Sequence, residues 1–101
     1  MNPAHPNNWV YVYLLRSKKN SSFYIGCTSD LYKRILEHND GKSYSTRKML
    51  PLELIYFEAF RSKKDAFERE RSLKYYCSAL KNLKKRLGNT FVKEDGRDEH
   101  I

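Results

Sequence analysis

The 101-residue sequence has few cysteines and no long apolar run. Its two cysteines, Cys27 and Cys77, lie far apart, a spacing that matches neither a paired zinc motif nor a secreted disulfide framework. Both have apolar or aromatic neighbours, which predicts buried free thiols and suits a reducing cytoplasm. No apolar run approaches the ~20 residues of a membrane helix. Residues 1–8 are polar and contain proline, so we expect neither a secretory signal nor a membrane segment.

Common catalytic signatures are missing as well. The four glycines form no phosphate-binding loop, and no serine lies in a nucleophile elbow. Acidic residues are a minority: 12 Asp and Glu stand against 20 Lys and Arg, which gives a net charge of +8. This excess and a pI of about 9.6 are typical of proteins that bind polyanions such as nucleic acids. Charge that serves only solubility is the alternative.

The patterns that are present indicate one small α+β domain. Hydrophobic residues make up 40% and aromatic residues 14%, enough for a single core. The predicted strands cover residues 9–16, 23–27 and 52–60, and the predicted helices cover 31–39, 63–76 and 79–87. The order is therefore β-β-α-β-α-α, with helices packed on three strands. We expect a flexible N-terminus at 1–8, a domain at 9–88 and a charged tail at 89–101.

A carboxylate interrupts the apolar face of the helix at 63–76. The residues that share this face by helical spacing are Ala66, Glu70, Leu73 and Cys77. A carboxylate there is unfavourable unless a metal ion or a basic group pairs with Glu70. A structural salt bridge is equally compatible with the pattern. So is a rotated helix in which Phe67 and Tyr76 define the core.

Two further groups suit phosphate chemistry. Arg34 and His38 lie one turn apart on the helix at 31–39. An arginine binds phosphate through two parallel hydrogen bonds and stabilises the charge that develops during phosphodiester hydrolysis. A solvated arginine and a surface histidine are the alternative, and taken singly they are favoured.

Three tyrosines of the first two strands, Tyr11, Tyr13 and Tyr24, share one face. They predict either a cross-strand aromatic cluster or phenols that line a site. A tyrosine has a pKa near 10, so a role as a base near neutral pH needs positive charge close by. Lys33, Arg34 or a bound cation could provide that charge.

The segment at 42–51 reads as a basic loop. Basic, aromatic and hydroxyl side chains alternate there, as on surfaces that bind a nucleic-acid backbone. Together with Lys33, the residues expected to contact nucleic acid are Lys42, Tyr44, Thr46, Arg47 and Lys48. Solvated loop charge is the alternative.

Taken together, these residues resemble the GIY-YIG endonuclease superfamily, in its small stand-alone bacterial form. The second motif is intact as Tyr24-Ile25-Gly26, and the first reads Tyr11-Val12-Tyr13, with Tyr11 where the family has glycine. Arg34 and His38 follow on the next helix, and Arg69-Glu70 matches the position of the family's metal-binding glutamate. The resemblance covers about residues 9–87.

The resemblance implies a three-stranded antiparallel sheet flanked by helices, and a metal-dependent endonuclease that hydrolyses DNA in repair or recombination. Glu70 would hold one divalent ion, Mg²⁺ or Mn²⁺, and Arg34 would stabilise the phosphate charge. Tyr24 or Tyr13 would orient or deprotonate the attacking water, assisted by His38. The asparagine often found near the end of the domain has no secure counterpart: the candidates are Asn89 and then Asn82.

The implied substrates are branched, nicked or single-stranded DNA. The main alternative is a non-catalytic nucleic-acid-binding module that kept the nuclease fold, and a scaffold protein with an incidental basic surface is the third. Retention of the tyrosines, Arg34 and Glu70 favours the enzyme, because a pure binder needs no carboxylate among phosphates. The oligomeric state is left open.

Overall fold

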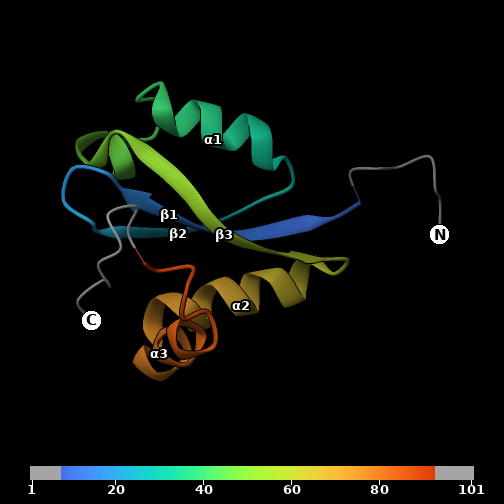
Figure 1. The fold of residues 1–101 in the computed structure, drawn as a ribbon. Helices are drawn as coiled ribbons and strands as arrows, with labels where there is room; N and C mark the ends of the chain where they lie inside the picture. The colour runs from blue at the N-terminus through green and yellow to red at the C-terminus, as the bar shows by residue number, and fades with distance from the viewer. Residues whose placement is uncertain (1–7, 93–101) are drawn as a thin grey trace.

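The structure, a computed structural model, describes residues 8–92. Residues 1–7 of the predicted flexible N-terminus and 93–101 of the predicted tail lie outside them. The elements, in chain order, are β1 (Val10–Ser17), β2 (Phe23–Thr28), α1 (Leu31–Asn39), the 3-10 helix η1 (Tyr44–Met49), β3 (Leu52–Phe60), α2 (Lys63–Tyr75) and α3 (Cys77–Arg86) (Figure 1). The predicted order is confirmed, with η1 added.

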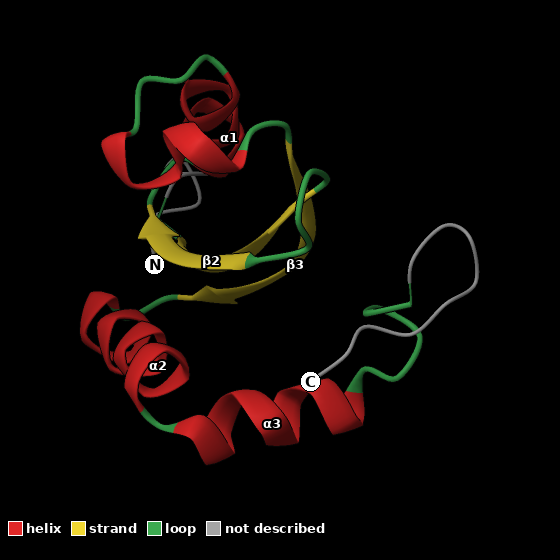
Figure 2. Ribbon diagram, turned by 90° about the vertical axis from the view of Figure 1, so that its left-hand side faces the viewer, coloured by secondary structure: helices red, strands yellow, loops and turns green. Residues whose placement is uncertain are grey.

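The three strands form one antiparallel sheet in the order β2-β1-β3. The central strand, β1, pairs Tyr13 with Gly26 of β2 on one side and with Phe57 of β3 on the other. Helix α1 covers one face of the sheet, and α2 and α3 lie beneath the opposite face (Figures 1 and 2). The predicted three-stranded sheet flanked by helices is therefore confirmed.

Each face of β1 contributes to a separate hydrophobic core. Val10, Val12 and Leu14 pack in the core that includes Ala66 and Leu73 of α2. Tyr13 and Leu15 pack on the other side with Leu52, and Leu31 and Ile35 of α1 border that second core. Side chains of β1 therefore alternate between the two cores, and both faces of the strand are buried because helices cover both sides of the sheet.

Side-chain caps and clamps hold the helices in place. Asp30 caps α1 by accepting a hydrogen bond from the Lys33 amide at 3.2 Å. Asn39, at the end of α1, accepts from the Leu52 amide at 3.0 Å and donates to the Leu52 carbonyl at 3.2 Å. This pair of hydrogen bonds between the Asn39 side chain and the Leu52 backbone fixes the last turn of α1 against the start of β3. His38, one residue earlier, is thereby held over the sheet.

The start of α2 carries a serine cap. The Ser62 hydroxyl accepts a hydrogen bond from the Asp65 amide at 3.1 Å, as a serine does at a helix N-cap. None of the helices within residues 8–92 has the length and apolar character needed to cross a membrane.

Three expectations from the sequence need correction. The segment predicted as an open basic loop folds into η1. The packed domain extends beyond residue 88, because Phe91 is 5% exposed and its ring meets that of Phe23 at 5.6 Å. Cys77 is exposed and Cys27 only half-buried. Tyr76 has extended backbone that separates α2 from α3, so Cys77 begins a new helix and does not continue the buried face of α2.

Candidate active site

A buried chain of hydrogen bonds joins β1, α1 and η1. The Tyr13 hydroxyl lies 2.8 Å from His38 Nε2, and His38 Nδ1 lies 2.7 Å from the Thr46 hydroxyl. Tyr13 is 2% exposed, and His38 and Thr46 are fully buried. The alternative interpretation of His38 as a surface residue is therefore wrong. Thr46 was predicted to contact nucleic acid, and that prediction is also wrong, because η1 turns its hydroxyl inward onto His38.

Gly26 makes room for the Tyr13 ring. The two residues are directly paired across β1 and β2. A Cβ built on Gly26 would lie 2.3 Å from the Tyr13 oxygen and 2.4 Å from its Cζ, far inside van der Waals contact. The glycine therefore lets the phenol cross the backbone of β2 to reach His38.

Tyr24 completes an aromatic group with Tyr13 and His38. Its ring centroid lies 5.1 Å from that of His38 and 6.3 Å from that of Tyr13. Unlike Tyr13, Tyr24 is only half-buried. Tyr11 does not join the group: its ring packs edge-on against Phe57 at 5.8 Å. The three tyrosines predicted to share one face thus divide into two neighbouring groups.

Arg34 brings a positive charge to this group. Its guanidinium lies close enough to the Tyr13 hydroxyl for its charge to oppose the increase in the Tyr13 pKa. Its Nη1 also donates to Glu37 Oε1 at 3.1 Å, and about a third of the side chain, 34%, stays exposed. A guanidinium has five N–H donors, so Arg34 keeps further donors for a phosphate besides the one bonded to Glu37.

Glu70 reaches the same region from the opposite layer of the fold. Its charge acts on the pKa values of both Tyr13 and Cys27, so the carboxylate lies near β1 and β2. Its Oε2 accepts from Lys74 Nζ at 3.0 Å, and its side chain is 22% exposed. Lys74 Nζ in turn lies 5.9 Å from the Tyr24 ring centroid. The salt bridge considered for Glu70 is therefore present, and it borders the aromatic group.

Burial keeps two of these groups in their neutral forms. Burial and then the neighbouring Tyr24 raise the pKa of Tyr13 to about 12, so its hydroxyl is protonated at neutral pH. Burial and then the positive charge of Arg34 lower the pKa of His38, so its ring is uncharged. A neutral imidazole has one donor and one acceptor nitrogen, which the Tyr13 and Thr46 hydroxyls can satisfy together.

The side chains near Glu70 suit at most one loosely held metal ion. Within residues 8–92, no three His, Cys, Asp or Glu side chains form a group that could hold a metal. Glu70 offers a hard carboxylate, and Glu37 of α1 already binds Arg34. Mg²⁺ often keeps several waters and binds through one or two carboxylates together with substrate phosphate. Glu70 fits that mode of binding, in competition with Lys74.

The remaining predicted contact residues lie on the surface. Besides the buried Thr46, these are Lys33, Lys42, Tyr44, Arg47 and Lys48, all exposed. Arg47 donates to the Gly41 carbonyl at 3.1 Å and stacks over Tyr44, with 5.5 Å to the ring centroid. Asn89 is exposed, and nothing within the described residues links its side chain to the aromatic group. Lys74 is not among the residues expected from the sequence, although its i,i+4 spacing from Glu70 indicates an ion pair on one helix face.

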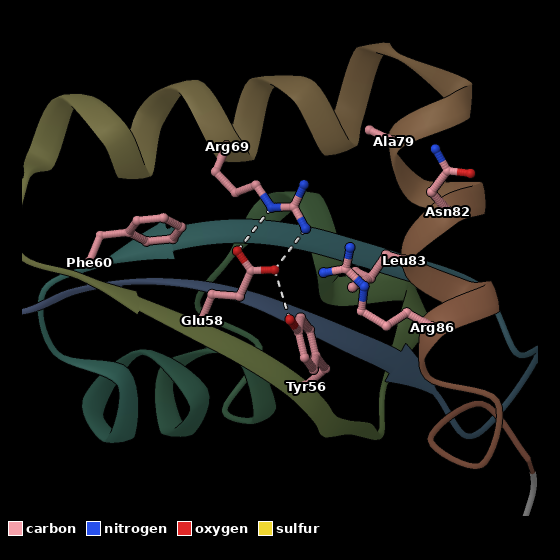
Figure 3. A pocket seen from close by; sticks show the side chains of 8 residues that line it. All are labelled: Tyr56, Glu58, Phe60, Arg69, Ala79, Asn82, Leu83 and Arg86. Atoms are coloured by element: carbon pink, nitrogen blue, oxygen red, sulfur yellow. Dashed lines mark hydrogen bonds and ion pairs between the residues drawn. The ribbon is translucent and has the colours of Figure 1, made fainter.

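Arg69, next to Glu70, belongs to a different site. Its Nε and Nη2 donate to the two oxygens of Glu58 at 2.9 and 2.8 Å, and the Tyr56 hydroxyl donates to Glu58 Oε2 at 2.7 Å. Figure 3 shows this network in a pocket of about 540 Å³ that also holds Asn82 and Arg86. Burial opposes ionisation of Glu58, yet the hydrogen bonds from Arg69 and Tyr56 lower its pKa overall. Arg69 thus anchors α2 to β3.

Comparison with known proteins shows the family of this chain. The model of the GIY-YIG catalytic domain matches residues 9–76. The UPF0213 protein YazA of Bacillus subtilis is 41% identical over 78 residues, which cover 76% of this chain and 74% of that protein. The UPF0213 protein CPE1444 of Clostridium perfringens is 39% identical over 94 residues, which cover 90% and 96%.

A solved structure is also similar. The solution NMR structure of the UPF0213 protein BH0048 from Bacillus halodurans matches with 35% identity and a TM-score of 0.49, over 78% of this chain and 84% of that one. On the family match over residues 9–76 and the identity to the UPF0213 proteins, the chain belongs to the GIY-YIG family, among its small UPF0213 members.

Proposed function

We propose that this protein is a metal-dependent endonuclease that hydrolyses phosphodiester bonds in DNA. The observation that supports the proposal is the meeting of five side chains from four separate elements. These are Tyr13 of β1, Tyr24 of β2, Arg34 and His38 of α1, and Glu70 of α2. We refer to them as the five-residue cluster. Membership of a nuclease family and a net charge of +8 support a nucleic acid as the substrate.

In this proposal Arg34 binds the scissile phosphate. One of its nitrogens is held by Glu37, which fixes the direction of the guanidinium. The remaining N–H groups would donate to non-bridging phosphate oxygens and stabilise the negative charge that grows as water attacks. Because the side chain is part-exposed, a phosphate could reach it from solvent.

The two tyrosines would take different roles. Tyr13 is almost fully buried and its pKa is raised to about 12, so it is a poor base and a good support for His38. Tyr24 is half-buried, so its hydroxyl is the better placed phenol to orient a water molecule. The positive charges of Lys74 and Arg34 lie close to Tyr24.

Glu70 would hold one divalent cation, with water and phosphate oxygens as its other ligands. Bound there, Mg²⁺ or Mn²⁺ would supply Lewis acidity and a template for the phosphate. Lys74 would have to release Oε2 or share the carboxylate, because its ammonium lies 3.0 Å away. An alternative function, binding without cleavage, is favoured by this same ion pair, since Lys74 balances the charge of Glu70 without a metal.

The test is cleavage of branched, nicked and single-stranded DNA with Mg²⁺ or Mn²⁺, comparing Glu70→Gln with Glu68→Gln. Both residues lie on α2, and Glu68 is exposed. We expect Glu68→Gln to cleave like the wild type and Glu70→Gln to lose at least a hundredfold in rate while still binding DNA. Binding with no metal-dependent cleavage by the wild type would establish the non-catalytic module instead. Equal rates in the two variants would refute the role of Glu70.

A further inference from the structure

A second recess lies beside the five-residue cluster, on the face of the sheet that α1 covers. Its volume is about 530 Å³, within the range of pockets that hold small molecules. The side chains that define it are Tyr11, Leu31, Tyr32, Ile35 and Phe57, with Asp30 as a charged group. We call it the aromatic recess. The roles proposed for the five-residue cluster make no use of it.

Two aromatic rings of the recess, those of Tyr32 and Phe57, are exposed to solvent and not buried in the hydrophobic core. Tyr32 is 77% exposed and Phe57 is 47% exposed, while Tyr11 packs edge-on against Phe57 with an interplanar angle of 69°. Rings in such differing orientations leave open faces and edges on which a flat ligand can stack. Stacking on aromatic side chains is how proteins hold the bases of single-stranded nucleic acids, whatever their sequence.

The carboxylate of Asp30 further limits which kind of ligand fits the recess. Asp30 Oδ1 accepts the Lys33 amide, but a carboxylate has about four acceptor positions and this bond uses one. Its negative charge disfavours a phosphate inside the recess and favours a neutral ligand that donates hydrogen bonds. An exocyclic amino group, as on adenine, cytosine or guanine, is such a donor.

The recess also lies close enough to the proposed phosphate site for one nucleotide to span both. Tyr11 and Tyr13 are two residues apart on the same face of β1, which places their Cα atoms roughly 7 Å apart. On α1, Leu31 and Ile35 of the recess bracket Arg34. A base in the recess would therefore leave its own or the adjacent phosphate close to Arg34.

We propose that the aromatic recess binds one unpaired nucleobase of the nucleic-acid substrate, next to the phosphate held by the five-residue cluster. The identity of the polymer rests on the function proposed above. A base inside a duplex cannot enter without leaving its stack, so the recess would select DNA with a flap, gap or branch over intact duplex. It would thus supply selectivity for DNA structure, with a preference for bases that carry an exocyclic amino group.

The test measures binding alone, without metal and without cleavage. Two DNA probes carry the same fluorescent adenine analogue, 2-aminopurine: one in an unpaired flap nucleotide and the other inside a continuous duplex. The proteins are the full-length wild type, Tyr32→Ala and Phe57→Ala, with Tyr75→Ala as the matched control because Tyr75 is 72% exposed but lies outside the recess. Circular dichroism checks that each variant is folded.

We expect the wild type to quench the flap probe and the control to behave like it. Tyr32→Ala and Phe57→Ala should weaken flap binding roughly 5- to 100-fold, as loss of one base-stacking contact implies, with duplex affinity changed less than twofold. Asp30→Asn keeps a helix-capping residue, and should reduce the preference for an amino-bearing base over thymine in the flap. Equal affinity of wild type and both ring variants for the flap probe would overturn the proposal, and so would equal losses on flap and duplex.

The outcome does not depend on catalysis. If Glu70→Gln abolishes cleavage but the ring variants bind flaps normally, the nuclease proposal stands and the base recess fails. If no cleavage occurs but flap binding is lost in the ring variants, the recess stands in a non-catalytic protein.

Discussion

Replacing Gly26 by alanine should disrupt the candidate site through one added methyl group. The new Cβ would lie 2.3 and 2.4 Å from the oxygen and Cζ of Tyr13. Tyr13 has no free space, since it is 2% exposed and bonded to His38. Overpacking of this kind costs roughly 1–3 kcal/mol, and for a domain near this size each kcal/mol lowers Tm by about 4–8 °C. We therefore expect a fall in Tm of roughly 4–24 °C, together with loss of cleavage.

Two other glycines give a matched series. A Cβ on Gly88 would meet nothing within 4 Å, so Gly88→Ala should stabilise by about 0.4–1 kcal/mol through the unfolded chain. Gly41 has φ +75°, where alanine is strained by roughly 1–2 kcal/mol, while its Cβ would only touch Leu50 at 3.8 Å. Urea denaturation should rank the three variants Gly26→Ala, then Gly41→Ala, then Gly88→Ala, from least to most stable.

A double variant shows which atoms collide. Tyr13→Phe removes the oxygen but leaves Cζ at 2.4 Å, so it should not rescue Gly26→Ala. Tyr13→Leu removes both atoms, and its combination with Gly26→Ala should be clearly less destabilising than the sum of the single changes. The reasoning is refuted if Gly26→Ala is as stable as Gly88→Ala, or if the Leu double variant is strictly additive.

Two further predictions concern charge. Burial and then Arg34 lower the pKa of His38, whereas the unfolded chain takes up this proton near pH 6.5, so stability is present above that pH and falls as the pH drops below it. In urea denaturation between pH 7.5 and 5, His38→Gln should lose less stability than the wild type; equal slopes would contradict this. Lys74→Met should lower the Mg²⁺ concentration for half-maximal cleavage roughly 1.4- to fivefold, since a part-exposed ion pair contributes about 0.2–1 kcal/mol. Lys81→Met is the control, because Lys81 is exposed. An unchanged Mg²⁺ requirement in Lys74→Met would count against competition between Lys74 and a metal ion at Glu70.

The sheet and the helices were predictable because their signals are local. The period-two pattern of the first strand, the serine cap before α2 and the apolar spacing of α1 each specify an element without knowledge of its neighbours. The resemblance then selected Tyr13, Tyr24, Arg34 and Glu70 from many similar side chains. The structure brings these residues together.

What the sequence could not show depends on contacts between distant segments. Thr46 looked like a surface contact because its neighbours are basic, and only its bond to His38 reveals its place in the core. Cys77 fitted the apolar spacing of α2, but the extended backbone at Tyr76 breaks that register. Phe91 stands beyond a glycine that suggested the end of the domain, yet it packs on Phe23.

The position of β2 explains how side chains from both layers can meet. β2 is an edge strand, so no further strand of the described sheet lies beyond it. Tyr24 belongs to the face that α1 covers, yet Lys74 of α2, from the opposite layer, approaches its ring. Glu70 likewise acts on Cys27 of β2 and on Tyr13 behind it. In a wider sheet another strand would separate the carboxylate of α2 from the arginine of α1. The short sheet with β2 at its edge is therefore what allows Glu70 of α2 and Arg34 of α1 to border the same aromatic group.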